Sequence, residues 1–361
     1  MQLIIPVFVT HQGCPHRCIF CNQEKTAGPY RTQRITRDIF EETVFAYLRH
    51  TKRRADRIQI AFYGGSFTGM EGDYQLELLG FAHSFIKRKL VDAVRVSTRP
   101  DYITEKSLDM LERFGVTTVE IGAQSMDDEV LNLSRRGHSS ADVRSAVMML
   151  RKRGFETGIH LMVGLPGDNS RKFDSTVAET IALCPDMVRI HPTIVFQGTA
   201  LAKAFQEGDY IPMGMSDAIE ACKFALLKFT GARIPVIRLG LQVTPEMMRE
   251  GSIIAGPFHP AFRSLVEEAI FFDMASSLLS FRPAKNSAVS FFLAPKDISS
   301  FRGQKNGNIQ RLKKIFGLAG ISVSGDPAQE RGSLATMVNG KKSWMIRMMG
   351  GFHEIKETIG V

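Results

Sequence analysis

The stretch LIIPVFVTHQGCPHRCIFC, residues 3–21, joins an apolar run to three closely spaced cysteines. The apolar run over residues 3–9 predicts a buried strand. Cys14, Cys18 and Cys21 follow on the loop after it, with the spacing C-x3-C-x2-C. In parallel α/β barrels, the loops at the C-terminal ends of the strands carry the chemistry. The stretch therefore predicts a metal centre at the end of the first strand of an α/β fold.

Apolar runs alternate with amphipathic helical patterns from the start of the chain to about residue 195. We expect further strands at residues 57–63, 93–98, 117–122, 157–163 and 187–195, and helices near residues 37–50, 73–89, 104–114, 127–134, 139–153 and 170–183. Repeated βα units form a parallel sheet with right-handed crossovers. Six units are too few to close an eight-stranded barrel. The expected fold is α/β, a partial (β/α)6 TIM-type barrel.

The pattern changes after residue 200, and from residue 285 the chain becomes basic. Residues 285–361 contain twelve Lys/Arg against five Asp/Glu, which is +7 of the net charge of +9. We expect a barrel core over residues 1–240, a helical connector over residues 241–284 and a small basic α+β domain over residues 285–361. A basic block of this kind suggests a polyanionic partner, although a merely solvated charged surface explains it equally well.

The composition is that of an ordinary globular protein, with 44% hydrophobic and 23% charged residues. No apolar run reaches the roughly 18 residues that a membrane-spanning helix needs, and the apolar N-terminus lacks the basic flank of a signal peptide. Five cysteines, an odd number with three of them clustered, do not suggest a secreted disulfide framework. We expect a cytoplasmic protein with no membrane partner.

The cysteine cluster lacks a fourth cysteine. Cys184 and Cys222 lie in helical patterns among apolar neighbours, and we expect both to be buried as small hydrophobic residues. Three thiolates can hold three corners of an iron–sulfur cubane and leave one iron with an open coordination position, which is the mark of a catalytic site rather than a structural one. The alternative is a zinc site that takes His11 or His16 as its fourth ligand.

This spacing, with the aromatic Phe20 directly before the third cysteine, resembles the radical SAM superfamily. The resemblance implies a 4Fe–4S cluster held by Cys14, Cys18 and Cys21, with S-adenosylmethionine (SAM) bound at the open iron. Reduction, by an external donor such as flavodoxin or ferredoxin, then cleaves SAM to a 5′-deoxyadenosyl radical, chemistry that belongs to the cofactors. Phe20 matches the aromatic residue that packs near the adenine in this family.

Other strand ends match the same family. Gly64, Gly65 and Ser66 follow the second strand where the family carries a glycine-rich turn, often Gly-Gly-Glu, whose backbone meets the methionine amino group of SAM. Ser66 replaces the acidic residue of that turn. By the same resemblance, Gln124 and Arg136 contact the ribose and carboxylate of SAM. The remaining residues expected at the cofactor are His160 and Met162, with the turn at residues 164–167 near the adenine.

Four strings narrow the resemblance: STRPD (97–101), IGAQS (121–125), RRGH (135–138) and HLMVGLPGD (160–168). Together they look like the radical SAM core of the Elongator catalytic subunit and its bacterial relatives, over roughly residues 1–240. A more distant similarity to oxygen-independent coproporphyrinogen oxidases lies around Gln124 and Arg136. The Q/R-x-x-G-x-G/A turn of the Elongator acetyltransferase domain is not found after residue 240, so the resemblance does not carry acetyl transfer to this chain.

The string FRGQKNGNI, residues 301–309, has the spacing of a KH module, in which a G-x-x-G turn between two helices clamps a nucleic-acid backbone. Asn306 holds the position of the second glycine and tolerates a left-handed conformation. We expect a KH-like order of strand, helix, turn, helix and strand. The RNA-binding candidates are Arg302, Gly303, Lys305 and Lys314. A plain helical corner with a solvated basic face is the alternative.

These observations predict a radical SAM enzyme that modifies a base in RNA, with tRNA as the expected partner and the transferase or oxidoreductase class left open. One alternative is radical chemistry on a small molecule or a protein. Another is an RNA-binding iron–sulfur protein without catalytic activity.

Overall fold

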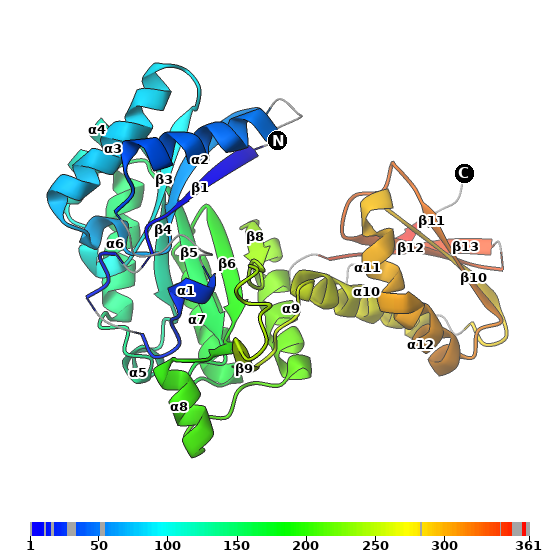
Figure 1. Ribbon diagram of the computed structural model, residues 1–361. Helices are drawn as coiled ribbons and strands as arrows, with labels where there is room; N and C mark the ends of the chain where they lie inside the picture. Colours follow the sequence, from blue (N-terminus) through cyan, green and yellow to red (C-terminus); the bar gives the residue numbers. More distant parts are fainter. Residues whose placement is uncertain are drawn as a thin grey trace. The chain divides into compact units, whose positions relative to one another are not determined.

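The computed structural model describes residues 2–10, 12–15, 18–26, 34–50, 55–281, 284–339, 341–348 and 356–358 (Figure 1). The chain divides into two compact units. The first comprises Met1–Met215 and Leu241–Pro260, and the second comprises Ser216–Gly240 and Ala261–Val361. The three-part organisation expected from the sequence stays a prediction.

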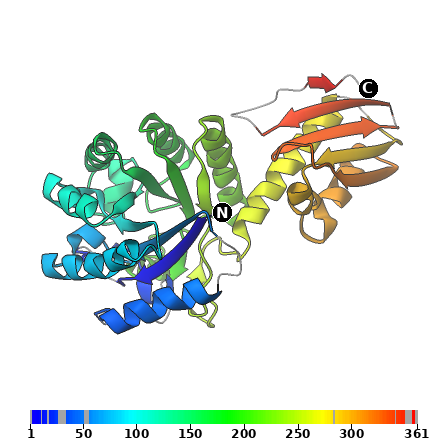
Figure 2. The same cartoon turned by 90° about the horizontal axis from the view of Figure 1, so that it is seen from above.

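The first unit contains a parallel sheet whose strands pair in chain order. These strands are β1 (Gln2–Phe8), β2 (Arg57–Tyr63), β3 (Ala93–Thr98), β4 (Val116–Gln124), β5 (Glu156–Val163) and β6 (Met187–Pro192). Viewed from above, they fan into a curved wall with helices along its outer side (Figure 2). The predicted α/β partial barrel is confirmed.

Helices connect consecutive strands, as expected for βα units. They are α2 (Arg37–His50), α3 (Gly72–Lys87), α4 (Glu105–Arg113), α5 (Asp128–Leu133), α6 (Ser140–Lys152) and α7 (Ser170–Ala182). Helix α4 begins at a capping box of Thr104 and Ser107, and α6 begins at one of Ser139 and Asp142. Such reciprocal bonds satisfy backbone N–H groups that the first helical turn leaves unpaired.

Shorter elements complete the first unit: α1 (Gln23–Thr26), η1 (Phe67–Gly69), η2 (Pro100–Tyr102), β7 (Val195–Phe196), α8 (Ala200–Glu207) and β9 (Ile253–Ala255). β7 and β9 form a small antiparallel pair. Residues 241–260 also contact the segment behind Cys21, because Thr244 donates a hydrogen bond to the carbonyl of Lys25 and the Lys25 ammonium donates one to Ser252.

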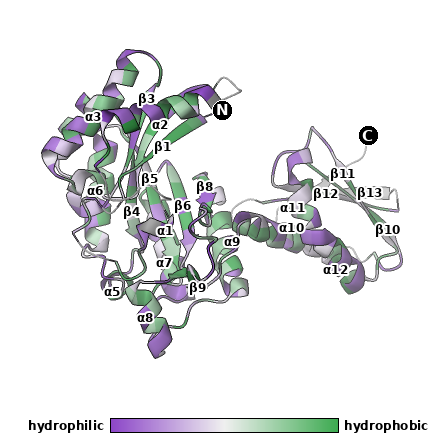
Figure 3. Cartoon of the chain, in the orientation of Figure 1, coloured by the Kyte–Doolittle hydropathy of each residue, from purple (hydrophilic) through white to green (hydrophobic). Residues whose placement is uncertain are grey.

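The two faces of the curved wall differ in chemistry. Side chains of alternate strand residues pack under the outer helices and are almost fully buried; examples are Ile60, Val94, Val119, Ile159 and Val188. In Figure 3 the strands are coloured as largely hydrophobic, while the outer helices also carry hydrophilic residues. The intervening positions point to the other face of the wall, as the two-residue period of a strand requires. That inner face carries the polar site described below.

The second unit packs helices against a mixed sheet. Its elements are α9 (Met215–Gly231), β8 (Val236–Leu239), α10 (Phe262–Phe281), β10 (Ala288–Leu293), η3 (Pro295–Asp297), α11 (Ile298–Arg302), η4 (Gln304–Asn306), α12 (Gly307–Phe316), β11 (Gly320–Gly325), β12 (Ser333–Val338), β13 (Lys341–Arg347) and β14 (Lys356–Thr358). The sheet has the order β11-β10-β12-β13-β14, with β10 and β11 parallel. The predicted order of strand, helix, turn, helix and strand is therefore present from β10 to β11.

Two further findings concern the remaining expectations. None of the helices in the described ranges has the length and hydropathy needed to cross a bilayer. Cys222 is buried in α9, as predicted, but the prediction for Cys184 is wrong. Helix α7 ends at Ala182, and Cys184 follows in a turn with a φ of +50°, where its side chain is exposed.

Candidate functional site

The three clustered cysteines lie together on the loop after β1, each of them half-buried. Burial, together with the charge of the nearby Cys18 sulfur, raises the pKa of Cys14. Burial and the sulfurs of Cys18 and Cys14 raise the pKa of Cys21 to about 12. Thiols that resist ionisation, as Cys14 and Cys21 do, are suited to a metal centre, since a bound cation supplies the positive charge that thiolates need.

Within the described ranges, no three Cys, His, Asp or Glu side chains are grouped as ligands of a single metal ion. A cubane places its cysteine ligands on different irons, so this finding does not conflict with an iron–sulfur centre. His11 and His16, the zinc-ligand alternatives, lie outside the described residues.

Two glycines bring the cysteine loop against the loop after β2. A Cβ atom on Gly65 would lie 2.2 Å from the carbonyl oxygen of Gln12, and one on Gly13 would lie 2.1 Å from that of Ser66. The Ser66 N–H also donates to the Gln12 carbonyl at 2.9 Å. Both positions therefore require glycine, because the two backbones touch. Gly64, at a φ of +102°, completes the turn.

The side chain of Ser66 points into the protein. Its hydroxyl lies 3.0 Å from the hydroxyl of Thr98 and accepts a hydrogen bond from the backbone N–H of Arg99. Ser66 is almost completely buried. The residue at the acidic position of the family turn thus connects the ends of β2 and β3.

Gln124 and Arg136 come together over the end of β4. The strand register shifts between Ile121 and Gln124, and Gln124 has a φ of +74°. Bulges of this kind redirect a side chain. A Cβ on Gly122 would lie 3.2 Å from Gln124 Nε2 and 3.3 Å from Arg136 Nη2. Arg136 Nη2 donates to the Gly122 carbonyl, and Nη1 donates to Cys18 Sγ at 3.0 Å. Two residues expected at the cofactor are therefore beside the cysteine loop.

Three buried polar atoms in the segment that carries Arg136 have no hydrogen-bond partner among the described residues: Ser134 Oγ, Arg136 Nε and His138 Nδ1. Burial, followed by the charge of Arg136, lowers the pKa of His138 to about 4. Buried polar groups normally have hydrogen-bond partners. Three buried polar atoms without a partner, beside three thiols, are therefore what is expected of a site that binds a polar ligand. The residues present therefore fit a cluster and its ligand.

A second group of polar side chains meets on the inner face of the wall around Glu120, which is fully buried on β4. Arg95 Nη1 donates to Glu120 Oε1 at 2.7 Å, Arg189 Nη2 donates to the same oxygen at 2.9 Å, and the Tyr63 hydroxyl does so at 2.9 Å. His160 Nε2 contacts the other carboxylate oxygen. We call these five residues, Tyr63, Arg95, Glu120, His160 and Arg189, the Glu120 cluster.

The Glu120 cluster determines the charge state of its members. Burial alone raises the pKa of Glu120, but the hydrogen bond from His160 and the charges of Arg189 and Arg95 outweigh it and hold that pKa well below its usual range. Burial lowers the pKa of His160 in spite of the nearby carboxylate. His160 thus lies in a buried ionic network, with its ring 6.2 Å from that of His191.

Of the five residues in the Glu120 cluster, only His160 was among the cofactor-binding residues predicted from the sequence. The sequence signal that could have identified the others is the two-residue period of a β-strand, by which alternate side chains point to the same face of the sheet. Arg95 and Glu120 interrupt otherwise apolar or small strand sequences, and His160 and Arg189 do the same on the next two strands. Charged residues at inward-facing strand positions are costly unless they are paired, which marks them for attention.

The other predicted cofactor residues have different surroundings. Phe20 packs against a buried apolar cluster of Ile19, Val195, Leu201, Ala202 and Tyr210. Met162 lies half-buried on β5, in register with His191 of β6. In the turn after β5, Asp168 accepts hydrogen bonds from the N–H groups of Gly164 and Asn169, and burial raises its pKa to about 6.

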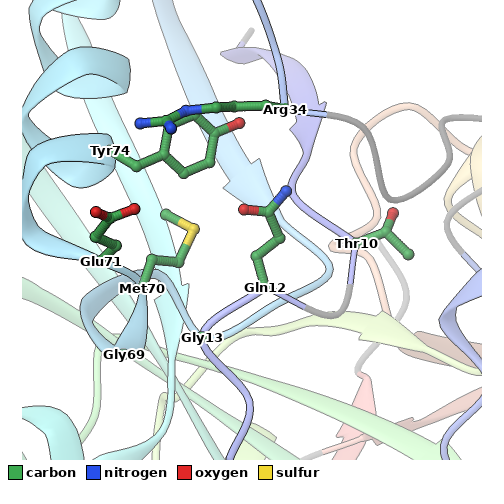
Figure 4. A pocket seen from close by; sticks show the side chains of 8 residues that line it. All are labelled: Thr10, Gln12, Gly13, Arg34, Gly69, Met70, Glu71 and Tyr74. Carbon is green, nitrogen blue, oxygen red and sulfur yellow. The ribbon is translucent and has the colours of Figure 1, made fainter.

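An open pocket of about 490 Å³ lies beside Gly13 (Figure 4). It is lined by Thr10, Gln12, Gly13, Arg34, Gly69, Met70, Glu71 and Tyr74. The Arg34 guanidinium lies 4.5 Å from the centre of the Tyr74 ring. The side chain of Gln12 points from the cysteine loop toward these two side chains (Figure 4). None of the three cysteines lines this pocket, and the sequence pattern did not indicate it.

Three of the candidate RNA-binding residues, Arg302, Gly303 and Lys305, lie at the corner between α11 and α12, whereas Lys314 lies in the last turn of α12. Gly303, Lys305 and Asn306 have φ values of +70°, +52° and +60°, so the predicted left-handed conformation of Asn306 is confirmed. Arg302, Lys305 and Lys314 are exposed. The N–H of Gln304, inside the turn, donates to Glu268 Oε2 of α10 at 3.0 Å. One backbone N–H of this turn is therefore already hydrogen-bonded to a carboxylate of the protein, that of Glu268.

Comparison with known families and proteins agrees with this geometry. Residues 8–179 match the family model of the radical SAM superfamily, and residues 185–271 match that of the radical SAM C-terminal domain. The chain belongs to the radical SAM superfamily. The family predicted from C-x3-C-x2-C is confirmed, and so is the similarity to the core of the Elongator subunit.

Among curated proteins, this radical SAM chain is 29% identical over 260 residues to a tRNA uridine(34) acetyltransferase of Methanocaldococcus infernus, with 62% of this chain and 48% of the relative covered. It is 25% identical over 265 residues to Elongator complex protein 3 of Bos taurus, with 60% of this chain and 47% of the relative covered. The chain thus spans about half the length of the curated relatives it matches.

A solved structure of the archaeal M. infernus Elp3, shortened at its N-terminus, has a TM-score of 0.58 with 19% identity, and covers 98% of this chain and 79% of that one. At this identity the likeness concerns the fold alone. It agrees with the partial barrel seen in the first unit.

Proposed function

We propose that this chain is a radical SAM enzyme that modifies a base in tRNA. The main observation in support is the group of three cysteines on the loop after β1, where Arg136 donates a hydrogen bond to Cys18. The chain is also a member of the radical SAM superfamily. The names of the relatives, which are tRNA uridine(34) acetyltransferases, support tRNA as the substrate class.

Membership of the superfamily implies use of SAM and a 4Fe–4S cluster. In our proposal Cys14, Cys18 and Cys21 hold the cluster. When bound, the two cofactors supply a 5′-deoxyadenosyl radical after one-electron reduction. The electron comes from an external donor such as flavodoxin or ferredoxin, in a cytoplasmic setting.

The chain's own residues orient the cofactor and shape the cavity in this proposal. Gly64 and Gly65 leave the backbone after β2 open to close approach, while Gln124 is redirected by its bulge toward Arg136. Phe20, Ser66, His160 and Met162 remain candidates for the same site. Because the Ser66 hydroxyl is already bonded to Thr98 and Arg99, we assign the contact at that turn to its backbone.

RNA binding by the second unit is proposed on the basis of charge. Arg302 and Lys305 are exposed cations beside the turn at Gly303, and α12 adds the exposed cations Arg311, Lys313 and Lys314. The carboxylate of Glu268 at the Gln304 amide works against phosphate binding at that amide. We therefore assign RNA contact to the exposed side chains rather than to the turn amides.

The test has two arms. Reconstituted full-length protein is reduced with dithionite in the presence of SAM, and 5′-deoxyadenosine is measured by liquid chromatography. In the second arm the gene is deleted, and modified nucleosides in total tRNA are compared by mass spectrometry. Production of 5′-deoxyadenosine together with a lost nucleoside supports the proposal. Turnover with unchanged tRNA supports a small-molecule or protein substrate instead, and RNA binding without turnover supports a non-catalytic iron–sulfur protein.

A further inference from the structure

The guanidinium of Arg136 lies against a cysteine sulfur as well as beside the expected SAM site. We propose that Arg136 is a positioning residue that raises the reduction potential of the cluster by donating a hydrogen bond to Cys18 Sγ. This inference rests on the proposed function, because it requires the three-cysteine cluster. It goes beyond the family resemblance, which gives Arg136 a contact with SAM only.

The position of the guanidinium is fixed from two sides. Nη1 lies 3.0 Å from Cys18 Sγ, and Nη2 donates to the carbonyl of Gly122 at the end of β4. The backbone N–H of Arg136 donates to the Leu131 carbonyl of α5 at 3.0 Å, and the side chain is buried. Ile19 N–H, next to Cys18, donates to the Ser134 carbonyl and so connects the cysteine loop to the same segment.

The charge of Arg136 reaches all three sulfurs. It lies close enough to Cys14 and Cys21 to favour their thiolate forms, and it touches Cys18 directly. Among the described residues, Arg136 has no carboxylate within ion-pair distance. Arg99, a second described cation near Cys14, is neutralised by two hydrogen bonds of 2.9 Å to Asp101. Among the residues that the structure describes, Arg136 is thus a positive charge at the cysteine loop without a carboxylate partner.

Hydrogen bonds to the sulfurs and the net charge around a cluster set its reduction potential. The couple concerned takes one electron from an external reductant, and the core changes from [4Fe–4S]2+ to [4Fe–4S]1+ without bond breakage. An N–H donor that carries a full positive charge stabilises the form with the extra electron, since charge-assisted hydrogen bonds are the stronger ones. Removal of Arg136 must therefore make reduction harder.

The test compares Arg136→Gln and Arg136→Lys with Arg135→Gln, in full-length protein reconstituted with iron and sulfide and without SAM. Arg135 is the exposed neighbour, so its replacement removes the same charge without touching a sulfur. Potentials are measured by dithionite titration with mediator dyes, followed by electron paramagnetic resonance. We expect Arg136→Gln to lower the equilibrium constant for reduction by about tenfold, which is 59 mV for one electron. Arg135→Gln should stay within about twofold of the wild type.

An unchanged potential in Arg136→Gln overturns the inference. If that variant fails to assemble a cluster, Arg136→Lys decides, because lysine keeps the charge but loses the planar fork that reaches both Gly122 and Cys18. A potential equal to that of the wild type then overturns the inference, and a lower one supports it. If the wild-type protein itself assembles no 4Fe–4S cluster, the proposed function fails, which is a different result.

Discussion

Arg95 Nη1 lies 2.7 Å from Glu120 Oε1, and neither side chain has more than 2% of its surface exposed. Gly158 on β5 leaves room for the Glu120 side chain, because a Cβ atom at this position would lie 3.0 Å from Glu120 Cγ and 3.2 Å from Met187 Cγ. Arg95 also donates to Gln59 on β2, so the pair connects neighbouring strands through the inner face. A half-barrel that is polar inside depends on such pairing, because each buried charge needs a partner.

Replacement of the carboxylate by an amide should therefore destabilise the protein strongly. Glu120→Gln leaves Arg95 and Arg189 without a counter-charge, and loss of one partner of a buried ion pair costs about 3–5 kcal/mol. The free energy of unfolding from urea denaturation measures the loss. The control is Glu105→Gln, which breaks an ion pair of Arg153 that lies largely in solvent and should cost less than about 1 kcal/mol. Equal losses in the two variants would show that the Glu120 cluster does not stabilise the fold.

His138 should make stability fall with acidity. Its pKa is about 4 in the folded protein, against about 6.5 for a free imidazole, so below pH 6.5 the unfolded chain binds a proton that the folded chain does not. Stability from this residue is complete above pH 6.5 and is lost as the pH falls toward 4. Between pH 7 and pH 5 we expect a loss on the order of 2 kcal/mol from this residue alone.

The contribution of His138 is isolated by comparison with His138→Gln, which cannot titrate but keeps a donor for the Ala123 carbonyl. Urea unfolding at pH 7 and pH 5 should show a smaller acid loss in the variant than in the wild type. Parallel losses in the two proteins would contradict the assignment.

The proposed ligand role of Cys14, Cys18 and Cys21 gives the most direct spectroscopic prediction. Cys14→Ala, Cys18→Ala and Cys21→Ala should each abolish the visible absorbance of a 4Fe–4S cluster and the formation of 5′-deoxyadenosine. Cys184→Ala and Cys222→Ala are the controls, since Cys184 is exposed in a turn and Cys222 is buried in α9. Iron and sulfide analysis after reconstitution measures the cluster content. Loss of the absorbance in the Cys184 variant would mean that the ligand set is wrong.

How far the sequence predicts this molecule depends on how local each signal is. The cysteine loop, the glycine turn at Gly64 and Gly65 and the alternation of strands and helices are short-range patterns, and each is present where it was expected. The contact between Arg136 and Cys18 joins residues 118 positions apart, and the bond of Gln304 to Glu268 joins α10 to a turn. No periodicity in the sequence encodes which distant side chains meet, so these contacts could be identified only from the three-dimensional structure.

The exposure of Cys184 illustrates the same limit at closer range. Its apolar neighbours suggested a continuing helix, but α7 ends two residues earlier and the chain turns through a left-handed conformation toward β6. A one- or two-residue difference in a helix end reverses the burial of the residue beyond it, and helix ends are the least certain part of a sequence-based assignment.

The contact between the loops after β1 and β2 should not tolerate a methyl group. In Gly65→Ala the new Cβ would lie 2.2 Å from the Gln12 carbonyl oxygen and 2.6 Å from that of Val9, both of them backbone atoms. We expect a loss of about 1–3 kcal/mol in unfolding free energy and a lower cluster content, because the cysteine loop must move. Gly72→Ala is the control, since no atom lies within 4 Å of its new Cβ, in the first turn of α3. A Gly65 variant as stable as the Gly72 variant, with full iron content, would contradict this packing.

Glu268 should weaken RNA binding at the corner between α11 and α12. Its Oε2 accepts the Gln304 N–H, and a Cβ on Gly303 would lie 2.3 Å from its Oε1, so the negative charge sits against the turn. Glu268→Gln keeps a hydrogen-bond acceptor but removes the charge. We expect about fivefold tighter binding of total tRNA, because two unit charges a few Å apart interact with about 1 kcal/mol in water.

The matched control for this last variant is Glu267→Gln, which makes the same change of net charge one residue away. Glu267 contacts Arg263 and Ser300 and not the turn, so its replacement should leave binding nearly unchanged. Affinities are measured by fluorescence anisotropy with labelled tRNA at 50 and 200 mM salt. Replacement of Arg302, Lys305 and Lys314 by Glu should weaken binding and flatten its salt dependence, since each lost phosphate contact lowers the slope. Wild-type protein that shows no binding at either salt concentration rejects RNA binding by this unit. If the protein binds tRNA tightly but neither Glu268→Gln nor replacement of the three cations changes the affinity, the RNA binds elsewhere on the chain.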